Sequence, residues 1–155
     1  MLLLITKNIN KPHIIRYKRD DGTDTWMKAD DFFVRHDLSH YAIEKTLGYK
    51  TAFIGLLNNG MDIRDFEDRE KRLKIIVTQE ACYAENMANL FLIEKIQGNS
   101  GNFNEMLASA FINMKLPFAV PVLSNNEIDS VRNCLSKLLN SWNDLPDGET
   151  MTLSR

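Results

Sequence analysis

The sequence predicts an α+β protein, mainly helical, with about five helices and a small antiparallel sheet. Apolar residues recur at helical spacing through most of the chain. Short segments that alternate between apolar and polar residues lie near both ends, and those near the N-terminus flank an Asp-Gly step. The chain has 155 residues, 44% hydrophobic and 26% charged. This composition fits a single globular domain over residues 1–155.

The strand signals come first along the chain. Residues 1–5 are apolar but too few to span a membrane, so they predict a short buried strand. Residues 13–19 and 23–28 flank the Asp-Asp-Gly turn at 20–22 and predict a hairpin. A two-stranded ribbon alone is marginally stable. We therefore expect residues 149–153, which also alternate, to join the hairpin in one sheet.

Five segments carry helical periodicity and are bounded by start and stop signals. Gly48 is a plausible C-cap for the first helix, and Thr51 is expected to cap the second. Ser124 and Glu127 have capping-box spacing before the last helix. Residues 118–123 carry a proline and predict an extended connection. The expected helices span residues 32–46, 51–59, 73–97, 102–115 and 124–142.

The chemically distinctive motif is His-Asp-x-x-His at residues 36–40, inside the first predicted helix. Residues four apart project from the same helical face, so His36 and His40 are close enough to share a ligand. Phe32 and Ile43 lie on that face too, which places both imidazoles inside an apolar stripe. A buried imidazole needs a carboxylate, a carbonyl, a water or a metal as its partner.

Glu80 is the expected carboxylate partner. On a helix spanning residues 73–97 it falls in the middle of an apolar face, near Val77 and Met87. Carboxylates are seldom fully buried without a partner. We therefore expect Glu80 to meet His36 and His40 in one divalent-metal site, and two imidazoles with one carboxylate suit zinc or another first-row metal.

Asp37 and Glu44 lie at the edge of the histidine stripe. They are candidate catalytic bases if a metal activates water, and they are equally consistent with acids that hydrogen-bond to the metal-binding side chains or with solvated acids. Two functions stay open. In the first, the protein is a metal-dependent hydrolase or a small-molecule-binding protein. In the second, it is a non-enzymatic interaction protein whose buried His/Glu cluster is a hydrogen-bond network.

The charge and the cysteine content limit the classes of partner and the cellular compartment that we expect. The net charge is −2 with both signs interspersed, so nothing indicates a nucleic-acid or membrane partner. A small-molecule ligand or a protein partner is the expectation. The two cysteines, Cys82 and Cys134, lack metal-type spacing and read as small buried residues in a reducing compartment. We expect a cytoplasmic protein.

The motif with its context, residues 31–44 followed by Leu47-Gly48, resembles a family of small uncharacterised bacterial proteins. Those chains place a hairpin before a His-Asp-x-x-His-aromatic-x-x-Glu helix and a Gly-Glu strand near the C-terminus. The resemblance implies the fold and names no function. The His-Asp-x-x-His core is also similar to that of the zinc-binding coenzyme-Q biosynthesis scaffold family. That family adds a Glu where this chain has Ala52, so the likeness covers His36, Asp37 and His40.

Overall fold

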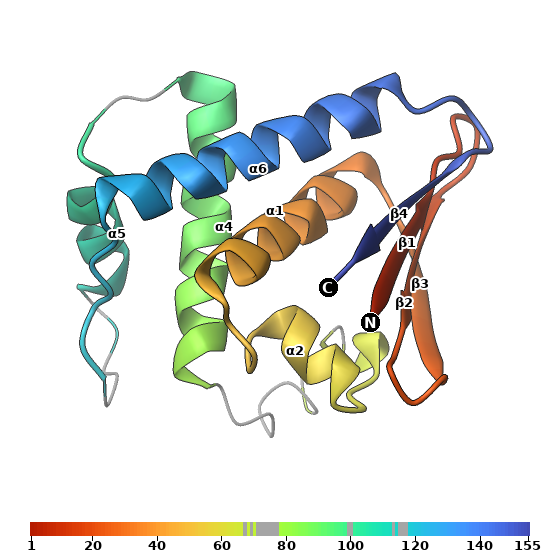
Figure 1. Ribbon diagram of the computed structural model, residues 1–155, viewed down its shortest axis with the longest axis horizontal. Coiled ribbons are helices and arrows are strands. Elements are labelled where there is room, and N and C mark those ends of the chain that lie inside the picture. The colour runs from red at the N-terminus through yellow and green to blue at the C-terminus, as the bar shows by residue number, and fades with distance from the viewer. Residues whose placement is uncertain (67, 69, 71–77, 99–100, 113, 115–117) are drawn as a thin grey trace.

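The computed structural model describes residues 1–66, 68, 70, 78–98, 101–112, 114 and 118–155. The expected α+β class is confirmed. Within these residues the chain forms five α-helices, one 3-10 helix and one four-stranded antiparallel sheet. Figure 1 shows the helices gathered on one side of the sheet. None of the helices in this part of the chain combines the length and apolar character needed to cross a membrane.

The sheet has the strand order β3-β2-β1-β4. Its strands are β1 (Leu2–Thr6), β2 (His13–Lys18), β3 (Asp24–Ala29) and β4 (Thr150–Ser154). The hairpin of β2 and β3 turns at Gly22, whose φ of 86° suits glycine. β4 joins the sheet through β1, antiparallel along its whole length. The predicted association of the C-terminal strand with the N-terminal strands is therefore correct.

One face of the sheet supplies the core. Alternate side chains such as Ile5, Ile15 and Tyr17 are fully buried, while the intervening Arg16 and Trp26 are exposed. This period of two is what a sheet with one covered face requires. The covering element is α1 (Asp31–Leu47), which contacts β2 and β3 as well as the later helices.

Helix α1 is the central helix of the fold. The Asp30 side chain caps it by accepting a hydrogen bond from the Phe33 N–H, and Gly48 ends it in the left-handed conformation, as expected. It packs against α4 (Gln79–Gln97) and α6 (Asn125–Asp144), which belong to the later half of the chain. Its residues 37–44 are consequently all buried. The histidine motif thus lies where α1 packs between the sheet and the helices α4 and α6.

Several predicted boundaries change in the structure. Helix α2 spans Phe53–Asn58 and follows Ala52, so the expected cap at Thr51 is wrong. Helix α4 begins after Thr78, which caps it, and the expected helical residues 73–77 lie outside the described part of the chain. Helix α5 (Phe103–Phe111) is shorter than expected, and residues 113 and 115 are not among those described. The capping box at Ser124 is confirmed.

Candidate metal centre

Helix α1 presents its two histidines one turn apart, as its sequence predicts. The ring centroids of His36 and His40 are 4.8 Å apart. The His36 side chain is 17% exposed and that of His40 is 3% exposed. One ring therefore lies at the edge of the interior and the other lies inside it.

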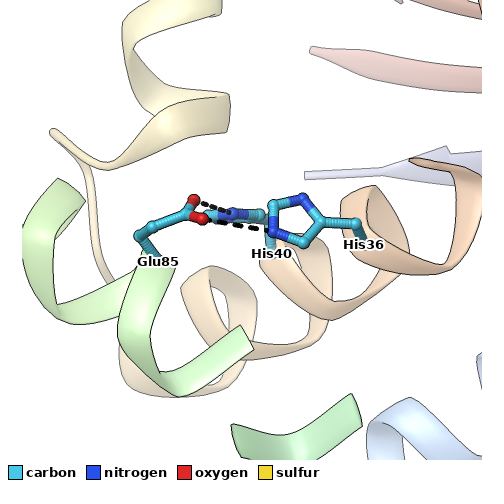
Figure 2. A group of neighbouring side chains, drawn as sticks. All are labelled: His36, His40 and Glu85. Carbon is cyan, nitrogen blue, oxygen red and sulfur yellow. Dashed lines mark hydrogen bonds and ion pairs between the residues drawn. The ribbon is translucent and has the colours of Figure 1, made fainter. Parts of the chain in front are cut away.

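The partner of both rings is Glu85 of α4, which crosses α1 at this point (Figure 2). His40 Nε2 lies 3.1 Å from one carboxylate oxygen of Glu85, and His36 Nε2 lies 3.4 Å from the other. Figure 2 shows both rings directing these nitrogens at the same carboxylate. One ligand atom from each of the three residues falls within 4.8 Å of the other two. Glu85 is 54% exposed, so the cluster has an open side.

The contacts within this cluster shift the proton affinities of its members. Burial alone would lower the pKa of His40, but its contacts with the carboxylates of Glu44 and Glu85 raise it to about 9. Hydrogen bonds to His36 and His40 hold the pKa of Glu85 well below its ordinary value. At neutral pH, in the absence of metal, His40 is therefore a cation paired with an anionic Glu85.

The other nitrogen of each ring also faces a carboxylate. His40 Nδ1 lies 3.6 Å from Glu44 Oε1, and His36 Nδ1 lies 4.0 Å from Asp37 Oδ1. Neither separation is a hydrogen bond, and within the described residues His40 Nδ1 is a buried nitrogen without a hydrogen-bond partner. Each imidazole thus has one carboxylate at Nε2 and another behind it at Nδ1.

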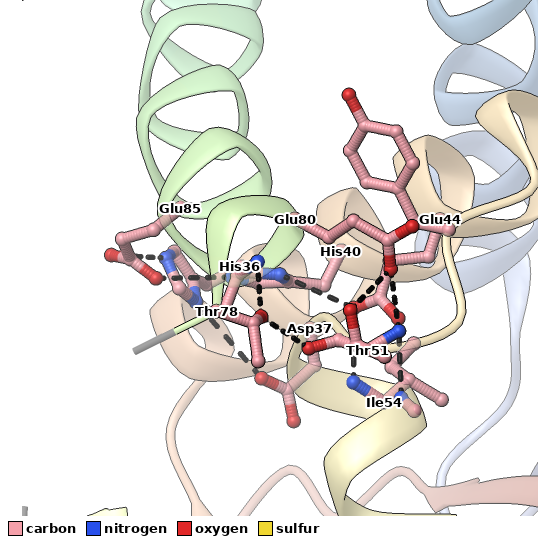
Figure 3. A network of polar contacts seen from close by, with 12 residues as sticks. His36, Asp37, His40, Glu44, Thr51, Ile54, Thr78, Glu80 and Glu85 are labelled. Atoms are coloured by element: carbon pink, nitrogen blue, oxygen red, sulfur yellow. Dashed lines mark hydrogen bonds and ion pairs between the residues drawn. The ribbon is translucent and has the colours of Figure 1, made fainter. Parts of the chain in front are cut away.

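Glu44 is fixed in place by the next element of the chain. Its fully buried carboxylate accepts hydrogen bonds from the backbone N–H groups of Ile54 (2.9 Å) and Gly55 (3.3 Å), at the start of α2. Arg155 donates a further hydrogen bond to it at 2.9 Å. A Cβ at position 55 would overlap the Lys50 carbonyl oxygen, so only glycine allows the backbone at position 55 to lie this close to Lys50. Figure 3 shows Glu44 between His40 and the start of α2.

Asp37 is also buried and occupied. Its Oδ2 accepts a hydrogen bond of 2.6 Å from the Tyr17 hydroxyl, which belongs to strand β2. Burial raises the pKa of Asp37, although the hydrogen bond from Tyr17 acts in the opposite direction. Asp37 and Glu44, the candidate bases, both lie on the Nδ1 side of the histidines. This placement suits carboxylates that orient the rings better than bases that meet a ligand at Nε2.

The structure corrects the expected third ligand, because Glu80 lies elsewhere. Its Oε2 accepts hydrogen bonds from the Lys50 N–H (2.7 Å), the Thr51 N–H (2.5 Å) and the Thr51 hydroxyl (2.7 Å) (Figure 3). Burial raises the pKa of Glu80, but these hydrogen bonds outweigh it and lower the pKa. Glu80 therefore holds the loop before α2, and Glu85 takes the place that was expected for Glu80.

The two residues differ both in height along α4 and in direction around it. Glu80 does point to the same side of the helix as the buried Met87, as its spacing predicts. It belongs to the first turn, however, and that end of α4 abuts the loop at Thr51. Glu85 lies about 7.5 Å further along the axis and about 140° around it, at the exposed edge of α4 where the histidines meet it. The expectation from the apolar face of α4 therefore missed both the height and the direction of the residue that meets the histidines.

The other prominent features lie outside this cluster. His13, the third histidine, accepts a hydrogen bond from the Asn8 N–H and packs its ring edge-on against Trp142. A cleft of about 750 Å³ borders the site from behind, and Glu44, Lys50 and Arg155 are among its lining residues. The two Nε2 atoms face Glu85. The cleft and the histidine cluster are therefore separate features joined by Glu44.

Comparisons with known proteins found no matching family model, no matching curated protein and no matching solved structure.

Proposed function

We propose that His36, His40 and Glu85 bind one divalent metal ion, zinc or another first-row metal, and that the solvent side of the ion receives a small-molecule ligand. The observation that carries this proposal is the convergence of two Nε2 atoms from successive turns of α1 on one carboxylate of α4. Two imidazoles, one carboxylate and an open fourth position form a common catalytic zinc ligand set.

The distances in the cluster support the proposal. Zinc–nitrogen and zinc–oxygen bonds of about 2.0–2.2 Å at tetrahedral angles place neighbouring donors about 3.3 Å apart. The two nitrogen–oxygen separations here are 3.1 and 3.4 Å. These separations go to different oxygens of Glu85, and the three ligand atoms lie within 4.8 Å of one another, so an ion would bind by drawing the side chains closer together.

The carboxylates behind the rings support it as well. Histidines that bind a metal through one nitrogen almost always present the other to a carboxylate, a carbonyl or water, which fixes the ring and raises its basicity. Glu44 Oε1 lies 3.6 Å behind His40 Nδ1 and Asp37 Oδ1 lies 4.0 Å behind His36 Nδ1, so each carboxylate is in the right place but would have to move closer to form this hydrogen bond. In this proposal the two acids position the ligands, and the metal acts as Lewis acid or water activator if the protein is an enzyme.

The alternative is a non-enzymatic interaction protein in which the cluster is an ion pair. A specific observation favours it: His40 Nε2 already lies 3.1 Å from Glu85 Oε2 without any metal, and the neighbouring carboxylates of Glu44 and Glu85 raise the pKa of His40 to about 9, which favours its protonated form. Metal binding must displace that proton, so it competes with an interaction that is already satisfied. The two proposals differ in whether metal out-competes the proton at physiological pH.

Zinc titration of the protein, purified without a nickel column and stripped by chelator, tests the proposal. We expect one zinc per chain in the wild type and at least about tenfold weaker binding in His36→Asn. The matched control is His13→Asn, which removes the histidine packed on Trp142 and should leave zinc affinity unchanged. Absence of stoichiometric zinc in the wild type, or equal affinity in both variants, would refute the metal site.

A further inference from the structure

A single stripe of α1 runs from solvent into the metal cluster. Phe32, His36 and His40 are each four residues apart and share one helical face. Phe32 is 61% exposed, whereas the side chains of His36 and His40 are 17% and 3% exposed. Exposure therefore falls along this stripe from Phe32 to His40.

Two phenyl rings lie at the exposed end of this stripe. The Phe32 ring lies nearly parallel to the His36 imidazole, with an interplanar angle of 24° and a centroid distance of 6.2 Å. Phe33, which is 48% exposed, packs edge-on against Phe32 at 5.6 Å. Adjacent large apolar side chains left in water beside a polar cluster are typical of a ligand-binding surface.

The proposed metal determines which chemical group of a ligand would bind to it. A divalent ion bound by two neutral imidazoles and the Glu85 carboxylate keeps one positive charge and an open position, which an oxygen anion fills well. Glu44 behind the site is already paired with Arg155, and Asp37 with the Tyr17 hydroxyl. Neither of these acids is directed at the open side.

We propose that the metal centre binds an aromatic or similarly planar apolar molecule through an anionic oxygen donor, with the planar group stacked on Phe32. This inference rests on the proposed metal site and adds the class of its ligand. The oxygen donor replaces solvent on the metal, and the planar group covers a ring that is otherwise exposed. Phe32 determines specificity here and Phe33 holds its ring from the side.

Two hydroxamates with the same metal-binding group test the ligand class. We expect zinc-loaded wild type to bind benzohydroxamate roughly fivefold tighter than acetohydroxamate, the gain of one aromatic stack. Phe32→Ala should lose this preference while keeping its affinity for zinc and for acetohydroxamate. The matched control is Ile96→Ala, an equally apolar truncation at an 84% exposed position of α4, which should keep the preference. The visible spectrum of cobalt-substituted protein shows whether each hydroxamate enters the coordination sphere.

The outcomes separate the two proposals. If the wild type binds zinc but binds both hydroxamates equally, or if Phe32→Ala retains the preference, the ligand class is wrong and the metal site stands. If neither hydroxamate changes the cobalt spectrum, the open position is not accessible and the ligand class is again wrong. If zinc does not bind stoichiometrically to the wild type, both proposals fall together.

Discussion

Glu80 and Glu85 lie five residues apart on α4, yet they have different environments. Glu80 accepts three hydrogen bonds from the backbone and hydroxyl of one loop, at Lys50 and Thr51. Glu85 is half-exposed and lies between the Nε2 atoms of two imidazoles, with which we propose it binds a metal. The partners of Glu80 are two backbone N–H groups and a hydroxyl, which do not titrate near neutral pH. The comparison shows that the titratable character of the partners, more than burial, separates a structural carboxylate from a candidate ligand.

Glu44 connects His40 to the start of α2 and to Arg155, and its removal should have the largest effect. In Glu44→Gln the amide NH₂ would face Arg155 or the N–H groups of Ile54 and Gly55, all of them donors. We expect a loss of about 3 kcal/mol in the free energy of unfolding in EDTA, because a buried acceptor is replaced and Arg155 loses its partner. Urea denaturation measures it, with the exposed Glu149→Gln as control. A loss no larger than that of the control would show that Glu44 is not a structural link.

Glu85→Gln tests the ligand side of the comparison. The variant keeps the size of the side chain and removes the charged oxygen donor, so zinc affinity should fall about 100-fold or more. Glu80→Gln is the matched control, with the same change on the same helix, and should retain the wild-type affinity. Competition with a chromogenic zinc chelator measures both. Equal losses in the two variants would mean that Glu85 affects zinc only through the stability of α4.

Glu80→Gln tests the structural side. The amide oxygen still accepts hydrogen bonds but without the negative charge, so we expect a loss of about 1–2 kcal/mol in the free energy of unfolding. Because Glu80 contacts only the Thr51 loop among the interactions described, the loss should be the same with zinc and with EDTA. Thermal unfolding in the two conditions decides it. A destabilisation that appears only with zinc would place Glu80 at the metal after all.

The smallest effect is the pH dependence of the metal-free protein. His40 has a folded pKa of about 9 against an ordinary value of 6.5. Its contribution is therefore fully present below pH 6.5 and is lost as the pH rises through 9. The lowered pKa of Glu85 makes its contribution fully present above its ordinary value of 4.5 and lost in acid. We expect a loss of about 1 kcal/mol from neutral pH to pH 10, since half-exposed Glu85 is screened by solvent.

Unfolding of the wild type and of Glu85→Gln in EDTA across this pH range checks the assignment. The variant lacks the anion that faces Nε2 of His40, so its stability should fall less steeply on the alkaline side. A wild type whose stability is unchanged or increases between pH 7 and pH 10 would contradict the ion pair.

The sequence predicts the elements of this protein better than the contacts between them. The hairpin at Gly22, the cap at Gly48 and the capping box at Ser124 depend on neighbouring residues, and each is correct. The pairing of His36 with His40 is equally local, because helical spacing fixes it. The carboxylate that meets the histidines depends on where α4 begins and on which of its faces packs against α1, and the spacing of apolar residues fixes neither. The expected helix cap at Thr51 is wrong for the same reason. Thr51 donates hydrogen bonds to Glu80 from both its hydroxyl and its N–H.

Strand β1 lies between β2, which follows it within a few residues, and β4, which the ribosome makes about 150 residues later. A nascent chain that has produced only residues 1–149 carries one unpaired edge on β1, with Leu3 and Ile5 beside it. Such an edge is a template for association with other chains. The pairing of this edge therefore waits until residues 150–154 have been made. Arg155, which follows β4 directly, brings Glu44 its cationic partner only at that moment.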